Sequence, residues 1–286
     1  MKFLGFTLIV ISAVSFGLMP IFATFAYKSG LDIKTILLFR FLSAAVIINI
    51  YIAIKKYSYP KGKLLFMLLF MGAVLYSAQA FSYFSAVSLI GSSLTSILLY
   101  LYPSLVLLLS SLLLKTKIYK LDIVALIFTT IGAVFVVGLK FENIDFIGII
   151  FGLFAALIYS IYIIVGTKAM RGTTPIIATG VIMAGSASVY VIYGVASKTA
   201  FPNTLEQWSW IGAITLVSTL IAIITFFAGL KLIGPVKASM ISTLELVVTL
   251  ILAFILLGEK MDYLQIIGSV FILTAAIILA KEKINE

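Results

Sequence analysis

The feature that most constrains this chain is an uncharged stretch of 51 residues, from Leu64 to Leu114. As one continuous helix it would be about 76 Å long, more than twice the ~30 Å thickness of the hydrocarbon core of a bilayer. The stretch must therefore cross a membrane at least twice. It lacks the alternation of apolar and polar residues that is typical of transmembrane β-strands, so the spans are predicted to be helices.

Hydrophobic residues make up 63% of the 286 residues and charged residues only 10%, which is far from the composition of soluble domains. Apolar runs separated by charges and turn signals predict ten transmembrane helices. We expect them at residues 3–27, 33–54, 64–88, 92–114, 121–139, 146–167, 174–197, 207–230, 237–257 and 262–280. The predicted fold class is therefore all-α, a polytopic membrane protein.

The basic residues predict how these helices are oriented. Of the twenty lysine and arginine residues, one, Arg40, lies inside a predicted helix. If the N-terminus is cytoplasmic, the outer loops hold only Lys28, Lys34, Lys140, Lys198 and Lys260. The others fall in cytoplasmic segments, in agreement with the positive-inside rule. Both termini are therefore predicted to be cytoplasmic. Because the basic residues are scattered over short loops, a nucleic-acid partner is not expected.

The chain contains no cysteine and no histidine. Disulfides, thiol chemistry and the usual side-chain ligands of zinc and haem are therefore excluded, and neither a metal nor a cofactor is expected. An enzyme would need convergent acid, base or metal-binding groups, and the predicted spans hold no cluster of carboxylates.

The chain also contains an internal repeat. A shift of 143 residues, half of the length, aligns Leu89-Ile90-Gly91 with Leu232-Ile233-Gly234, and other matches keep the same offset. This offset indicates two units of five helices, at residues 1–142 and 143–286. Because five is odd, the second unit must enter the membrane from the opposite side. Inverted repeats of this kind are typical of carriers that open a midplane site alternately to the two sides.

Four short patterns stand out in the predicted spans and the loops beside them: Phe39-Arg40-Phe41, Tyr102-Pro103, Leu244-Glu245 and Leu257-Gly258-Glu259 followed by Ile267-Gly268. As a set they resemble the patterns of EamA-type transporters of the drug/metabolite transporter superfamily. The proline that commonly follows the glutamate of the third pattern is replaced here by Leu246. The resemblance covers essentially the whole chain. It implies a tandem repeat of ten helices, a central cavity lined mainly by helices 1, 3, 4, 6, 8 and 9, and a small metabolite as substrate, often an amino acid.

Only two ionisable residues, Glu245 and Arg40, lie well inside the predicted spans, where a charge costs roughly 2.5–3.5 kcal/mol on insertion scales. Glu245 lies about 12 Å into its helix, close to the midplane. It could bind a substrate amine, take up a coupling proton, or be satisfied by neighbouring hydroxyls or by Arg40. Arg40 lies about 10 Å from the outer end of its helix, and could snorkel, pair structurally or recognise an anionic group.

The uncharged candidates for substrate contact are Tyr76, Gln79, Tyr83, Tyr102, Tyr159 and Ser242, and Pro103 is the candidate hinge. The first three are spaced three and four residues apart and therefore share one helix face, which suits either a cavity or interhelical hydrogen bonds. Tyr102 and Tyr100 flank a leucine, so at most one of them faces a cavity. Pro103 leaves a backbone carbonyl without its usual partner, either as a hinge or as a static kink.

Together these features predict a secondary transporter of a small neutral or zwitterionic metabolite in the bacterial cytoplasmic membrane. Amino acids are the favoured substrates and export the favoured direction. No Walker A motif is present, so transport would be passive or driven by a gradient, with proton coupling through Glu245. A lipid-linked carrier or flippase is the alternative, followed by an integral membrane enzyme. The protein is expected to be a monomer or a homodimer.

Overall fold

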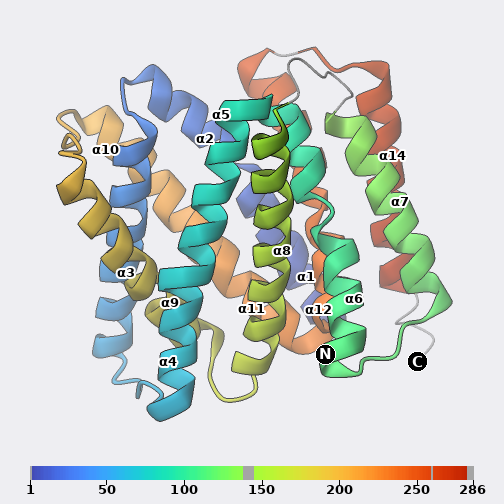
Figure 1. Ribbon diagram of the computed structural model, residues 1–286, viewed down its shortest axis with the longest axis horizontal. Coiled ribbons are helices and arrows are strands. Elements are labelled where there is room, and N and C mark those ends of the chain that lie inside the picture. Colours follow the sequence, from blue (N-terminus) through green and yellow to red (C-terminus); the bar gives the residue numbers. More distant parts are fainter. Residues whose placement is uncertain (1, 138–144, 259, 282–286) are drawn as a thin grey trace.

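The computed structural model describes residues 2–137, 145–258 and 260–281. Within these ranges it has ten helical spans that are long and apolar enough to cross a membrane, and no strand (Figure 1). The prediction of an all-α protein with ten spans is therefore confirmed. Lys140 and Glu259, which the sequence analysis used, lie outside the described residues.

Each half contains five spans, but the spans are divided differently into helical elements. The first half consists of α1 (Lys2–Gly17), α2 (Met19–Lys28), α3 (Ile33–Ile54), α4 (Gly62–Phe70), the π-helical turn η1 (Met71–Tyr76), α5 (Ser77–Leu99), α6 (Tyr102–Leu114) and α7 (Lys120–Val137). The second half consists of α8 (Phe146–Ala169), α9 (Pro175–Ala196), α10 (Leu205–Thr215), the π-helical turn η2 (Leu216–Ile221), α11 (Ala222–Ile233), α12 (Pro235–Ser242), α13 (Leu244–Leu252), the π-helical turn η3 (Ala253–Leu257) and α14 (Tyr263–Lys281).

Short polar residues define where four of these helices begin. The residues that cap α3, α8, α9 and α10 are Asp32, Asp145, Thr174 and Thr204. Each accepts a hydrogen bond from a backbone N–H that has no partner within its helix. At α3 the donor is Thr35 N, 2.7 Å from Asp32 Oδ1. Partial burial would raise the pKa of Asp32, but the hydrogen bonds from Thr35 and the charge of Lys34 bring this pKa below its ordinary value.

The two halves are arranged as inverted repeats. Equivalent helices meet, because α3 packs along α9 and α7 packs along α14. In Figure 1, α1 starts at the face marked N, whereas α8 starts at the opposite face. Two close contacts repeat as well: a Cβ on Gly5 would lie 2.4 Å from Ile233 Cγ2, and one on Gly148 would lie 2.5 Å from Ile90 Cγ2. The two contacts are equivalent, because Gly148 follows Gly5, and Ile233 follows Ile90, by the same shift of 143 residues.

One helix, α5, carries the chain from the third span into the fourth. The rings of Phe81 and Phe151 lie 6.2 Å apart between centroids, and Leu98 lies beside Gly152 of the same neighbouring helix, α8. A straight helix would hold residues 81 and 98 about 25 Å apart. α5 must therefore fold back between them, in the region where the sequence predicts the end of the third span and the start of the fourth.

Three spans are interrupted near their middle. The first is interrupted at Leu18, between α1 and α2, within the single span that the sequence predicts; Pro20, which has no N–H to donate, follows this interruption. The fourth breaks between α5 and α6, immediately before Pro103, and the ninth breaks at Thr243, between α12 and α13. The breaks in the fourth and ninth spans occupy equivalent positions of the two repeats, and interrupted helices of this kind form the midplane sites of many transporters.

Candidate functional site

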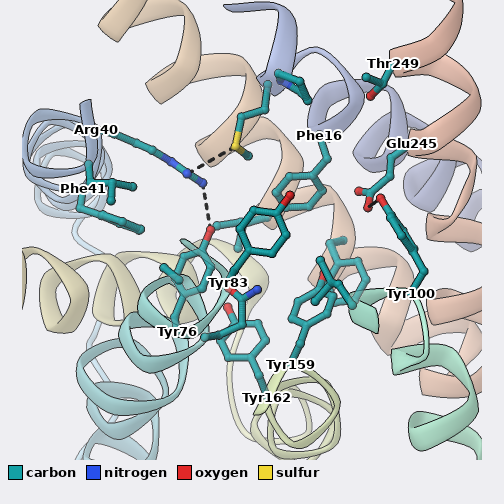
Figure 2. A pocket seen from close by; sticks show the side chains of 18 residues that line it. Phe16, Arg40, Phe41, Tyr76, Tyr83, Tyr100, Tyr159, Tyr162, Glu245 and Thr249 are labelled. Carbon is teal, nitrogen blue, oxygen red and sulfur yellow. Dashed lines mark hydrogen bonds between the residues drawn. The ribbon is translucent and has the colours of Figure 1, made fainter. Parts of the chain in front are cut away.

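A cavity of about 220 Å³ lies inside the bundle, where the three interrupted spans meet (Figure 2). Its lining residues come from the first, second, third, fourth, sixth, eighth and ninth spans, and most of them are apolar or aromatic. Its polar lining residues are Arg40, Tyr76, Gln79, Tyr83, Tyr100, Tyr159, Tyr162, Glu245 and Thr249. Six of these spans are those that the family resemblance implies, and the second span is added to them.

Glu245 faces this cavity from the ninth span. It lies in the first turn of α13, directly after the break at Thr243, so its carboxylate sits at the positive end of a half-helix. Its Oε1 accepts a hydrogen bond from the hydroxyl of Tyr100, which lies in the break of the fourth span. The two equivalent helix breaks therefore bring a tyrosine and a glutamate together. A carboxylate held in this way can bind a cation or carry a proton.

Arg40 lies on the opposite wall of the cavity (Figure 2). Its Nε donates to Thr219 Oγ1 at 2.7 Å, its Nη2 to the hydroxyl of Tyr76 at 2.9 Å, and its Nη1 to Met19 Sδ at 3.4 Å. Its guanidinium carbon lies 5.0 Å from the ring centroid of Phe41. The side chain is only 7% exposed. It therefore does not snorkel to the surface. It forms hydrogen bonds to neutral side chains inside the bundle and is part of the cavity wall.

The structure gathers most of the other sequence candidates at the same cavity. Tyr76, Gln79 and Tyr83 all line it, as their shared helix face allows, and Tyr159 lines it from α8. Their roles in substrate binding stay predictions.

Three other candidates lie outside the lining. Tyr102 is 1% exposed and its hydroxyl donates to the carbonyl oxygen of Ser239 at 3.0 Å, so Tyr100 rather than Tyr102 faces the cavity. Ser242 is the buried last residue of α12. Pro103 is buried in the first turn of α6, directly after the break, and its action as a hinge stays a prediction.

The sequence analysis missed several aromatic lining residues, among them Phe16, Tyr162 and Phe226. Tyr162 matters most, because its buried hydroxyl has no hydrogen-bond partner among the described residues. A ligand in the cavity could satisfy it. Its signal in the sequence was weak: a tyrosine within an apolar helix is common in membrane proteins, and only packing tells which side it faces.

The chemistry of this site is that of recognition. It offers one carboxylate, one guanidinium and several phenolic hydroxyls in a mainly apolar surrounding. Among the described residues, no three histidine, cysteine, aspartate or glutamate side chains come together to hold a metal ion. Such a set of groups can orient a small molecule through its charged ends.

Comparison with known sequences indicates the family. The family model of the EamA-like transporter family matches the chain twice, over residues 3–138 and 146–281. The chain is 23% identical over 278 residues to the uncharacterized transporter YcbK of Bacillus subtilis (strain 168). The matched region covers 92% of this chain and 88% of YcbK. It is 27% identical over 181 residues to protein PecM of Dickeya dadantii (strain 3937), covering 62% of this chain and 61% of PecM.

A solved crystal structure has the same fold. It superimposes with a TM-score of 0.78, covers 97% of this chain and 98% of its own, and shares 17% sequence identity. At that identity the likeness establishes the fold alone. The two family matches extend over nearly the whole chain, as the four sequence patterns imply. The chain therefore belongs to the EamA-like transporter family of the drug/metabolite transporter superfamily, and it is a multi-pass membrane transporter.

Proposed function

We propose that this protein is a secondary transporter that moves a small neutral or zwitterionic metabolite across the bacterial cytoplasmic membrane. Amino acids are the favoured substrates and export the favoured direction. The observation that carries the proposal is the position of Glu245, a carboxylate at a helix break that faces a cavity inside the bundle. Intramembrane carboxylates in such positions commonly serve as substrate or proton sites.

Among the described residues, Glu245 accepts one hydrogen bond, from Tyr100, which leaves further acceptor capacity for a ligand. An ammonium group of the substrate would form a charge-assisted hydrogen bond with the ionised carboxylate. Without substrate, a proton could neutralise the same group. Exchange of the substrate amine for a proton at one carboxylate would couple the export of the substrate to the import of a proton.

The size of the cavity supports a small substrate. Its volume of about 220 Å³ is below the 300–1,000 Å³ that is typical of pockets for drug-sized ligands. A bulky lipid-linked molecule would need a much larger space. The cavity thus favours a free metabolite over the substrate of a flippase.

The inverted repeats supply a means of alternating access. The third and eighth spans each contain a π-helical turn, and the fourth and ninth each contain a break. If the two repeats exchange conformations, the cavity opens to one side and then to the other without moving the site itself.

The test is uptake of radiolabelled amino acids into proteoliposomes, with and without an imposed pH gradient. The variants are Glu245→Gln and, as the matched control, Glu206→Gln, which makes the same change at an exposed residue of α10. We expect saturable, gradient-driven flux in the wild type and the control, and loss of gradient dependence in Glu245→Gln. Equal gradient-driven flux in both variants would refute the proposal for Glu245. If neither the wild type nor the variants transport any amino acid, other metabolites or lipid-linked substrates become the favoured candidates.

A further inference from the structure

We propose that Arg40 forms an oxyanion subsite in this cavity, so that the substrate carries a carboxylate or a similar planar oxyanion at the end opposite Glu245. The inference rests on the proposed function and narrows its substrate class. It makes the ligand a zwitterion rather than a neutral molecule or a simple amine.

The first argument is the number of hydrogen-bond donors that Arg40 retains. A guanidinium has five N–H groups, and Arg40 uses one on Nε, one on Nη1 and one on Nη2. Each terminal nitrogen therefore keeps one further N–H without a partner among the described residues. The acceptor of Nη1 is a thioether sulfur, which is a weak acceptor. Donors on both terminal nitrogens suit the two oxygens of a carboxylate.

The second argument is charge. The partners of Arg40 are a threonine, a tyrosine, a methionine and the ring of Phe41, all of them neutral. No ion pair of Arg40 occurs in the described part of the chain. A buried cation is ordinarily paired with an anion, because taking a charge out of water is costly. Glu245, the one carboxylate in the cavity lining, lies on the far wall and bonds to Tyr100 (Figure 2). An oxyanion bound at Arg40 would supply the missing negative charge.

The third argument is rigidity. The two strongest acceptors of Arg40, Tyr76 and Thr219, are equivalent positions of the two repeats, because they differ by 143 residues. Both lie in π-helical turns, η1 and η2. Thr219 is held in turn, since its Oγ1 donates to the carbonyl oxygen of Ile214 at 2.9 Å. The guanidinium is thus fixed by both repeats before any ligand arrives, which lowers the entropy cost of binding.

The repeat also explains why the cavity has only one such subsite. The position equivalent to Arg40 in the second repeat is Met183, which is fully buried and uncharged. Conversely, the position equivalent to Glu245 in the first repeat is Tyr102. One charge comes from each repeat, and the two charges face each other across the cavity. A zwitterion would therefore bind in a single orientation, with its oxyanion at Arg40 and its amine at Glu245.

The experiment uses the absence of cysteine from the chain. Thr249→Cys introduces a single thiol in the cavity lining, and its rate of modification by a small methanethiosulfonate reagent reports access to the cavity of the purified full-length protein. The probes are propionate, which offers a carboxylate alone, and propylammonium, which offers an amine alone. Each is titrated as a protectant of the thiol in the parent and in variants built on it.

We expect propionate to protect the thiol in the parent and in Glu245→Gln, and to lose at least about tenfold in apparent affinity in Arg40→Met, which copies Met183. Arg40→Lys keeps the charge but not the planar pair of donors, so it should bind propionate with intermediate affinity. Lys34→Met, which removes an exposed cation near the start of the same helix, should match the parent. Gel filtration and thermal unfolding identify any variant that fails to fold, and Arg40→Lys then serves as the test.

Two results would overturn the inference: no protection of the parent by propionate, or unchanged protection in a folded Arg40 variant. The proposal for Glu245 is read separately, from propylammonium. If propylammonium protects Glu245→Gln as well as it protects the parent, the role of Glu245 fails while the oxyanion subsite stands. If propionate fails to protect the parent while propylammonium protection depends on Glu245, the oxyanion subsite fails and the role of Glu245 stands.

Discussion

Gly72 is the position where we expect the smallest substitution to have the largest effect. It lies in η1, against the backbone of α9, and an added Cβ would lie 2.0 Å from the carbonyl oxygen of Ile182. Its own carbonyl oxygen accepts hydrogen bonds from the hydroxyls of Ser77 and Ser186, each at 3.0 Å. Gly72→Ala must therefore push the two spans apart, because a backbone carbonyl cannot move aside as a side chain can.

The magnitude follows from these contacts. Restoring an ordinary contact distance requires a shift of more than about 1 Å, and overpacking of this kind typically costs about 1–3 kcal/mol. The shift also breaks the hydrogen bond from Ser186, and such interhelical bonds are worth about 0.6 kcal/mol on average in a membrane protein. We expect Gly72→Ala to lower the free energy of unfolding by about 2–4 kcal/mol. Because η1 ends at Tyr76, the variant should also weaken propionate binding at Arg40.

The assay is equilibrium unfolding of the purified protein in detergent, followed by helical circular dichroism. The matched control is Gly212→Ala, in α10, where an added Cβ meets nothing within 4 Å. This control should leave stability unchanged or raise it by up to about 1 kcal/mol, since alanine favours helix over glycine. A Gly72→Ala variant whose stability lies within about 0.5 kcal/mol of the wild type would refute the close approach of η1 and α9.

Two further predictions concern a helix cap and the pair of tyrosines. Asp32→Ala should cost about 0.5–2 kcal/mol at neutral pH through loss of the cap on Thr35. Because folding lowers the pKa of Asp32, the stability that its carboxylate contributes should be lost as the pH falls through the folded-state pKa. The Asp32→Ala variant should show no such loss, and thermal unfolding measured against pH will compare the two proteins. Tyr100→Phe should weaken protection by propylammonium, whereas Tyr102→Phe, whose hydroxyl bonds to Ser239, should lower stability and leave that protection intact.

Much of the architecture was predictable from the sequence. The ten spans follow from apolar length, which is a local property that a bilayer of fixed thickness enforces. The repeat follows from a constant offset, and Glu245 and Arg40 stand out because charges are rare in spans. The shared face of Tyr76, Gln79 and Tyr83 follows from helical spacing, and all three line the cavity.

The rotation and interruption of the helices depend on tertiary packing. Helices in lipid are apolar on every side, so hydrophobic periodicity does not tell which face meets the bundle. For this reason the sequence favoured Tyr102, while packing turned Tyr100 toward Glu245. The same limit hid Tyr162 in the lining and the burial of Arg40 between two π-helical turns. The ten spans, the repeat and the two intramembrane charges all follow from the sequence. That these charges face each other across one cavity follows from packing between distant segments.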